Sequence, residues 1–283
     1  MTSDLAIKDV AERTGIAAGT IRMWEQRYGF PAPGRTASGY RRYNEEDVEA
    51  LRKVVALRHR GLSVPAAIAR ARDAGGPSDH PSIYAAVAAS DIAARPQVLK
   101  KSTLVALSKA IEHEALALAA APVVFAAFQR EPFYRRVEQR YRRLALHADA
   151  AAVFADFPRG LRHPQGAPAE IPVAPGDALG NEWAVVIDAP GYAACLLAWE
   201  RPGVSEPGGP GDRDRRFEAI WTVDPRATRH AAQVAARLAG RGDPAFGEQL
   251  EELLADRPLA LEEPAPALTA LTNRMVSYLE AAG

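Results

Sequence analysis

The chain has 283 residues, with 35 Lys or Arg and 35 Asp or Glu, so its formal net charge is zero. Apolar residues make up 48% and charged residues 25%, which is ordinary for a soluble globular protein with room for two cored domains. The single cysteine, Cys195, excludes an internal disulfide and any multi-cysteine metal site. No signal peptide or bilayer-spanning run is visible, so we expect a cytoplasmic protein without a membrane partner.

Composition shifts along the chain divide it into three parts. Residues 73–81 contain four Gly or Pro and no apolar period, which is typical of a linker. We therefore expect an N-terminal domain at 1–75, a second domain at 82–240 and a helical tail at 241–283. The residues 203–214 hold four Gly and two Pro and are expected to form a surface loop.

The N-terminal pattern predicts two helices joined by a tight turn. The first helix begins near Ile7 and ends at Gly15, where glycine supplies the left-handed conformation that the turn needs. The second helix spans residues 18–28 and places three large apolar side chains on one face: Ile21, Trp24 and Tyr28. Its opposite face carries polar side chains that would face a major groove: Thr20, Arg22, Gln26 and Arg27.

A small β-ribbon is expected directly after this helix, with Gly39 at its tip. Arginines at positions 35, 41 and 42 would reach phosphates, while Tyr40 and Tyr43 brace the ribbon. Residues 20–43 hold five arginines and one acidic residue, Glu25, a local excess suited to a polyanion. Asn44 is expected to cap the next helix, whose first turn is acidic.

The string TIRMWEQRYGFPAPGRTASGYRRY, followed by NEEDVEAL, closely resembles the MerR family over about the first quarter of the chain. The resemblance implies a winged helix-turn-helix that binds double-stranded promoter DNA as a homodimer on a palindromic site. Members often distort the promoter spacer, so RNA polymerase would be an indirect partner. We therefore expect DNA contacts from the following residues: Thr20, Arg22, Gln26, Arg27, Arg35, Tyr40, Arg41 and Arg42.

One feature departs from many members of that family, which continue into a long dimerising coiled coil. Here Gly75, Gly76, Pro77 and Pro81 interrupt the chain at that point, and no sustained heptad follows. The dimer contact must come from elsewhere. An apolar stripe with Leu271 and Met275, on a helix expected at residues 265–281, either packs on the chain's own domain or forms the dimer contact.

The middle of the chain predicts a mixed-sheet α/β domain, which makes the fold class α plus α/β with a C-terminal helix. Strands are expected at 123–129, 151–157, 182–189, 194–200 and 217–224, and helices at 100–119, 131–148 and 225–239. The first two strands flank a helix, which favours a parallel crossover. The turn at Asp188–Tyr192 favours an antiparallel pair.

Aromatic and arginine side chains gather just after the first expected strand, where a mixed sheet often has a ligand crevice. Candidate ligand-binding residues are Gln129, Arg130, Phe133, Tyr134, Trp183 and Trp199. The competing interpretation is that the aromatic residues on strands belong to the core.

The same region resembles the DICT sensory domain, on the strings KKSTLVALSKAIEHEA, VVFAAFQREPFYRR, AAVFADF, EWAVVIDAPGYAACLLAWERPG and FEAIWTVDP. This resemblance implies signal sensing over residues 82–240, with suggested links to light responses and cyclic dinucleotide signalling. It identifies neither a cofactor nor a ligand, so the signal, a small molecule or a protein, stays unknown.

No pattern for catalysis or metal binding emerges. The adjacent residues Glu112, His113 and Glu114 would point different ways on a helix. Cys195 lies in an apolar run, which favours an inert buried thiol. The leading hypothesis is a signal-gated transcription regulator. The alternatives are a DNA-binding protein whose second domain only binds other proteins, and an enzyme fused to a DNA anchor.

Overall fold

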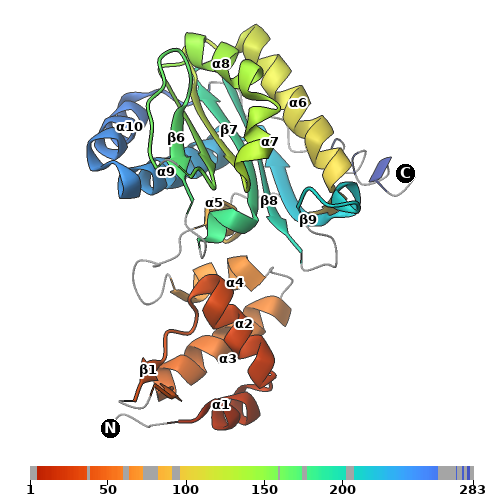
Figure 1. Ribbon diagram of the computed structural model, residues 1–283, viewed down its shortest axis with the longest axis vertical. Coiled ribbons are helices and arrows are strands. Elements are labelled where there is room, and N and C mark those ends of the chain that lie inside the picture. Colours follow the sequence, from red (N-terminus) through yellow and green to blue (C-terminus); the bar gives the residue numbers. More distant parts are fainter. Residues whose placement is uncertain are drawn as a thin grey trace.

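The computed structural model describes residues 5–36, 39–59, 64–72, 82–90, 96–158, 160–173, 177–201 and 207–260, together with Thr272, Val276, Leu279 and Glu280. Two bodies lie one above the other along the long axis of the molecule (Figure 1). The N-terminal body is helical with a small ribbon. The larger body is a sheet with helices on both faces, which confirms the predicted fold class.

The N-terminal body packs its helices around one apolar centre. Its elements are α1 (Ile7–Thr14), α2 (Ala18–Tyr28), β1 (Gly34–Arg35), β2 (Arg41–Arg42), α3 (Glu45–His59) and α4 (Val64–Arg72). Asn44 caps α3 as predicted, because its Oδ1 accepts from the backbone N–H of Asp47 at 2.8 Å, and the Asp47 carboxylate accepts from the N–H of Asn44 at 2.9 Å. The winged helix-turn-helix is therefore assembled by local signals.

A short helix, α5 (Ile83–Ala88), lies between the two bodies. Its N-cap is Ser82, whose Oγ accepts from the N–H of Ala85 at 2.9 Å. Helix α5 contacts α4 on one side and α9 (Pro225–Gly242) on the other. Buried side chains of both bodies consequently form one continuous apolar cluster.

The larger body contains a seven-stranded sheet in the order β3-β9-β8-β7-β4-β5-β6. The strands are β3 (Gln97–Lys100), β4 (Val123–Phe128), β5 (Ala150–Ala155), β6 (Ala169–Pro172), β7 (Glu182–Ala189), β8 (Tyr192–Glu200) and β9 (Arg216–Thr222). Strands β4, β5 and β6 run parallel, and the remaining neighbours pair antiparallel. The predicted crossover, hairpin and mixed sheet are confirmed.

Helices cover both faces of the sheet (Figure 1). One face carries α6 (Lys101–Leu118), α7 (Glu131–Arg135) and α8 (Glu138–His147); the other carries α5, α9 and α10 (Pro244–Asp256). Helices α9 and α10 cross at two glycines, and a Cβ on Gly247 would lie 2.4 Å from the Cα of Gly240. Glycine is required there because the two backbones touch.

The sequence did not predict β3, β6 or α5, and it left two helical regions undivided. Strands β3 and β6 lie at the two edges of the sheet, and each has only four residues, which is too short for an alternating pattern to stand out. Strand β6 also ends in a proline, which is typical of edge strands. Helix α10 follows α9 almost at once and was assigned to an undivided helical tail. The helix expected at 131–148 is two helices, because Val137 leaves the helical conformation at φ −120° and ψ 5°.

Beyond residue 260 the C-terminal tail is described at four positions, all helical. Val276 packs against the apolar cluster that contains Leu99, Leu104 and Phe217. The Glu280 carboxylate accepts from the N–H of Lys100 at 2.9 Å. Leu271 and Met275 lie outside the described residues, as do the linker residues 73–80, so the dimer helix remains a prediction.

Candidate nucleic-acid interface and signal site

The turn between α1 and α2 sets the angle of the second helix. Gly15 has φ +72°, and its N–H donates to the Ala11 carbonyl, as the sequence predicted. Helix α2 buries Ile21, Trp24 and Tyr28. Its polar side therefore faces outward.

The polar side of α2 presents Arg22 and Gln26, which are exposed, and Thr20, which is half-buried. Arg22 forms no hydrogen bond or ion pair with any residue that the structure describes. A cation left in water this way keeps its charge available for a polyanion.

The ribbon is tied to α2 by one ion pair. Strands β1 and β2 pair Gly34 with Arg42 and Arg35 with Arg41, and Gly39 lies at the predicted tip with φ +82°. The Arg41 Nε donates to both oxygens of Glu25, at 2.6 and 2.8 Å. The one acid of this basic stretch thus orients the wing against the helix.

Tyr43 lies beneath this ion pair and is buried. Burial raises the pKa of its hydroxyl to about 12; Glu25 acts in the same direction, whereas the charges of Arg41 and Arg22 lower it. Arg22 of α2 and Arg41 of β2 are therefore both close enough to Tyr43 to act on the pKa of its hydroxyl.

The other predicted DNA contacts occupy different environments. Arg35 and Tyr40 are exposed at the wing, whereas Arg42 is half-buried. Arg27 lies at the other end of the helix, with its Nη2 3.4 Å from the Asn181 Oδ1 of the larger body. Arg27 thus contacts the second domain, a position that helical spacing alone did not indicate.

Helix α2 docks on the sheet through an aromatic pair. The rings of Tyr28 and Trp199 have centroids 5.3 Å apart, and their exposed fractions are 7% and 3%. Trp199 lies directly opposite Glu182 in the β7–β8 ladder. The C-terminal end of α2 therefore packs beside the Glu182–Trp199 pair of strands β7 and β8, and α5 is bound at the same place.

Glu182 holds α5 at this place through hydrogen bonds. Its Oε2 accepts from the N–H groups of Ile83 and Tyr84, at 3.1 and 3.2 Å, and the Tyr84 hydroxyl donates to Glu218 at 2.7 Å. Complete burial raises the pKa of the Glu182 carboxyl to about 7, although hydrogen bonds from Ser82, Tyr84 and Ile83 lower it. The second oxygen, Oε1, has no hydrogen-bond partner among the described residues.

The six candidate ligand residues do not form one site. Tyr134 is fully buried among aromatic rings, Trp183 donates to the Ser108 hydroxyl at 2.9 Å, and Trp199 is the docking residue. Arg130 is exposed and pairs with Asp156 at 3.2 Å. Only Gln129 and Phe133 share a cluster.

That cluster holds two buried cations that the sequence did not single out, Lys101 and Arg215. Gln129 is buried and has φ +51°, a left-handed conformation that is uncommon outside glycine. Its Oε1 accepts from the Arg215 Nη1 at 3.1 Å. Lys101 lies over the Phe133 ring, 4.1 Å from its centroid.

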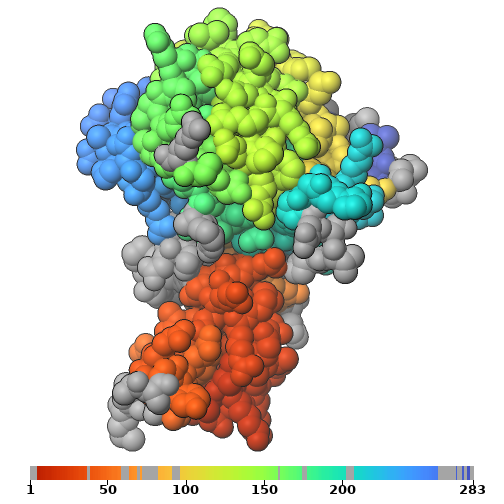
Figure 2. All heavy atoms as spheres, viewed as in Figure 1, coloured from red at the N-terminus to blue at the C-terminus, as the bar shows by residue number. Residues whose placement is uncertain are grey.

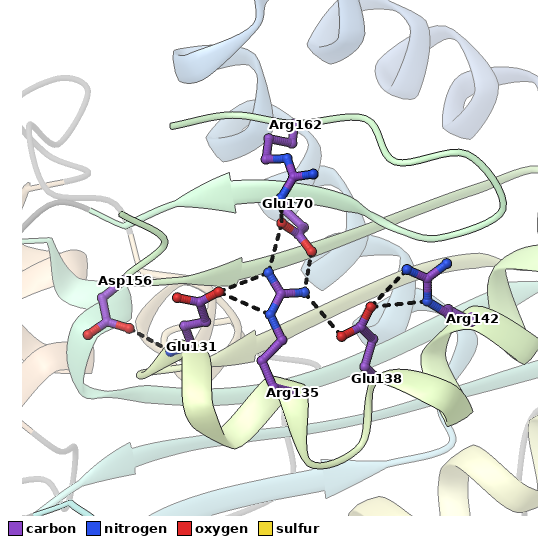
Figure 3. A network of polar contacts seen from close by, with 7 residues as sticks. All are labelled: Glu131, Arg135, Glu138, Arg142, Asp156, Arg162 and Glu170. Atoms are coloured by element: carbon purple, nitrogen blue, oxygen red, sulfur yellow. Dashed lines mark hydrogen bonds and ion pairs between the residues drawn. The ribbon is translucent and has the colours of Figure 1, made fainter. Parts of the chain in front are cut away.

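A second polar cluster surrounds Arg135 beside α7 (Figure 3). This guanidinium bonds to three carboxylates, those of Glu131, Glu138 and the buried Glu170. A cleft of about 340 Å³ opens there, lined by Glu131, Arg135, Phe157, Pro158, Arg162 and Glu170. Each of the three carboxylates is already paired with a cation. The network therefore holds α7 against β6.

Catalytic and metal chemistry finds little support in the described residues. No group of three His, Cys, Asp or Glu among them is placed to hold a metal ion. Burial raises the pKa of the Cys195 thiol to about 12, so its thiolate is disfavoured. Asp224 caps α9 by accepting from the N–H of Arg226 at 2.8 Å.

Three stretches of the chain match known families. Residues 5–73 match the family described as MerR HTH family regulatory protein. Residues 81–201 match the DICT domain, described as a sensory domain in diguanylate cyclases and two-component systems. These two matches confirm the resemblances seen in the sequence. Residues 211–283 match the C-terminal domain of a two-partite extracellular sensor domain, which the sequence analysis did not foresee.

Curated relatives match this chain over short stretches of 54 to 70 residues. The transcriptional repressors CarA and CarH of Myxococcus xanthus are 49% identical over 70 residues and 40% identical over 58 residues. The transcriptional regulator YfmP of Bacillus subtilis is 43% identical over 54 residues. These matches cover 24%, 20% and 19% of this chain, and 24%, 19% and 39% of the respective relatives. Within the described residues, no helix is long and apolar enough to cross a bilayer.

Proposed function

We propose that this chain, which carries a MerR-type helix-turn-helix module followed by a DICT sensory domain, is a promoter-binding transcription regulator gated by a signal. The observation that supports this best is the double contact of α2. Its exposed side carries Arg22 and Gln26, while its last residue, Tyr28, packs on Trp199 of the sensory sheet. Helix α2 would thus contact DNA with its exposed side and the sensory sheet with its last residue.

DNA binding would use the outward side of α2 and the wing together. Arg22, Arg35 and Tyr40 are exposed, and the Glu25–Arg41 ion pair holds the wing in place beside the helix. Phosphate contacts of arginine supply affinity, whereas side chains in the groove select the sequence. We assign Arg22 to the groove and Arg35 to a phosphate.

Gating would act through the docked end of α2. A signal can change DNA affinity only if it binds two conformations of the regulator unequally. Loosening the Tyr28–Trp199 contact, or the Arg27–Asn181 contact beside it, would free the orientation of the recognition helix.

The same proposal implies the binding partners and the domain organisation of the chain. The regulator would bind a palindromic promoter as a homodimer, act on RNA polymerase indirectly and reside in the cytoplasm. We propose the division 1–75, 82–240 and 241–283 for its domains.

The first test concerns DNA. Arg35→Ala should weaken binding to all sequences alike and lower the salt slope by about one, whereas Arg22→Ala should cost about 1–3 kcal/mol and change the preferred operator. Fluorescence anisotropy across a salt series measures both effects. Arg237→Ala, which removes an exposed arginine from α9, is the matched control. Equal affinities for all four proteins would refute the assignment.

The second test concerns docking. Trp199→Leu removes the ring that holds Tyr28 and should change operator affinity at least threefold, because the recognition helix loses its support. Trp221→Leu, on the opposite face of the same sheet, is the control and should leave affinity unchanged. If both variants bind as the wild type does, the domains are uncoupled. The second domain would then be a protein-interaction module.

A further inference from the structure

Lys101 and Arg215 lie side by side although 113 residues separate them in the sequence. The register of β3 and β9 pairs Lys100 with Arg216, and the Lys101 N–H donates to the Arg215 carbonyl at 2.9 Å. Both residues are buried, with exposed fractions of 8% and 4%. Buried cations require anionic partners.

A loop carboxylate supplies the partner that the two cations share. Asp212 belongs to the short helix η2 (Asp212–Asp214). Its Oδ2 pairs with the Lys101 Nζ, and its Oδ1 accepts from the Arg215 Nε at 2.9 Å. The segment that carries Asp212, residues 207–214, lies on the surface of the sensory domain (teal in Figure 2).

This carboxylate leaves part of Arg215 unmatched. The Nη1 of Arg215 bonds to Glu200 at 2.7 Å and to Gln129 at 3.1 Å. The Nη2, which shares an edge of the planar guanidinium with Nε, is buried and has no partner among the described residues. An anion on that edge normally accepts from both nitrogens.

Among the described residues around the Phe133 ring, positive charge exceeds negative charge. Three cations surround the Phe133 ring: Lys101 at 4.1 Å, Arg136 at 5.8 Å and Arg215 at 5.9 Å from the centroid. Two carboxylates, Asp212 and Glu200, face them. Burial lowers the pKa of the Lys101 ammonium, and Arg215 and Arg136 add to this, while Asp212 opposes it. Binding of an added anion would reduce the repulsion between these three cations.

We propose that Lys101 and Arg215 form a binding site for the phosphate group of a small ligand, and that Asp212 occupies this site when the ligand is absent. A carboxylate has two oxygens, one for Lys101 and one for Nε. A phosphate has a further oxygen for Nη2, with the Phe133 ring as the adjoining wall. The unmatched nitrogen therefore selects a tetrahedral oxyanion over a carboxylate.

Displacing Asp212 would reach the DNA-binding module through β9. Helix η2 leads directly into β9, on which Glu218 accepts from Tyr84 of α5 at 2.7 Å. This last step rests on the proposed function, since it treats the bound phosphate as the signal. Binding itself is independent of DNA and can be measured without it.

The experiment uses the full chain and isothermal titration with inorganic phosphate and with adenosine monophosphate, at constant ionic strength. Asp212→Asn removes the competing charge and should tighten phosphate binding about tenfold. Asp214→Asn, an exposed acid of the same helix, should leave binding unchanged. Lys101→Met should abolish binding, while Lys109→Met, exposed on the same α6, should not.

Each outcome of the titrations either supports or overturns the proposed phosphate site. Tightening in Asp212→Asn, together with loss in Lys101→Met, supports it; tighter binding of the monophosphate than of free phosphate assigns it to a phosphate ester. Equal phosphate affinity in wild type, Asp212→Asn and Lys101→Met overturns it. If Asp212→Asn does not fold, the Lys101→Met and Lys109→Met pair gives the same decision. Phosphate binding in a chain that fails to bind DNA would refute the proposed function alone.

Discussion

Arg22 and Arg35 in the helix-turn-helix module lie exposed, whereas Arg215 and Arg229 in the sensory domain are held among carboxylates and carbonyls. An exposed guanidinium keeps its hydration and stays available to a polyanion. A guanidinium inside the protein must be paired, because burying it alone is far too costly. The same residue type is therefore left exposed to solvent in one region and is paired within the fold in the other.

Replacing an arginine that pairs with a buried carboxylate should have the largest effect on stability. Arg229 pairs with the buried Asp188, with Nη2 and Oδ1 3.2 Å apart, and also donates to the carbonyls of Leu254 and Arg257. Arg229→Ala leaves Asp188 charged and unpaired and should lower the free energy of unfolding by about 3–5 kcal/mol. Urea denaturation measures it. Arg237→Ala, on the exposed side of the same α9, should change it by less than about 0.5 kcal/mol. Equal losses of stability in Arg229→Ala and Arg237→Ala would contradict the proposed difference between paired and exposed arginines.

The buried carboxylate between the two regions should give a pH-dependent stability of intermediate size. Burial raises the pKa of Glu182 from its ordinary 4.5 to about 7, so the unfolded chain releases this proton first as pH rises. Stability from this group should therefore fall between those two pKa values and level off above the higher one, by roughly 3 kcal/mol at most.

Urea unfolding at pH 5 and pH 8 tests this sign. Glu182→Gln cannot ionise, so its stability should gain on the wild type as pH rises. Glu248→Gln, the same change at an exposed position of α10, is the control and should keep the wild-type profile. Parallel profiles for wild type and Glu182→Gln would show that Glu182 does not titrate in this range.

Helix caps should give the smallest effect and a finer comparison of the two regions. The side chain of Asn44 caps α3 in the module, and that of Asp224 caps α9 in the sensory domain. Either residue changed to Ala should lower the free energy of unfolding by about 1 kcal/mol. Only the Asp224 effect should shrink in high salt, because a carboxylate also interacts with the helix dipole. A salt-dependent loss at Asn44 would contradict this account.

The sequence predicted most of the module and the central strands, because those signals are local. Gly15, the apolar face of α2 and the Asn44 cap each act within a few residues, and β7 has the bounds 182–189 that the sequence predicted. The sequence could not tell which of the aromatic candidates belong to the core. Tyr134 and Trp183 are packed, as aromatic side chains on a sheet usually are.

Residue order by itself determined that an arginine-rich helix and wing precede a mixed-sheet domain, since periodicity, turn residues and family resemblance are all written along the chain. Tertiary structure alone decided which cations are paired and which are exposed. Lys101 meets Arg215 only because the edge strand β3 pairs with β9, and Tyr28 meets Trp199 only because α2 docks on β8. Pairing between distant strands depends on the packing of the whole sheet, and no local pattern encodes it.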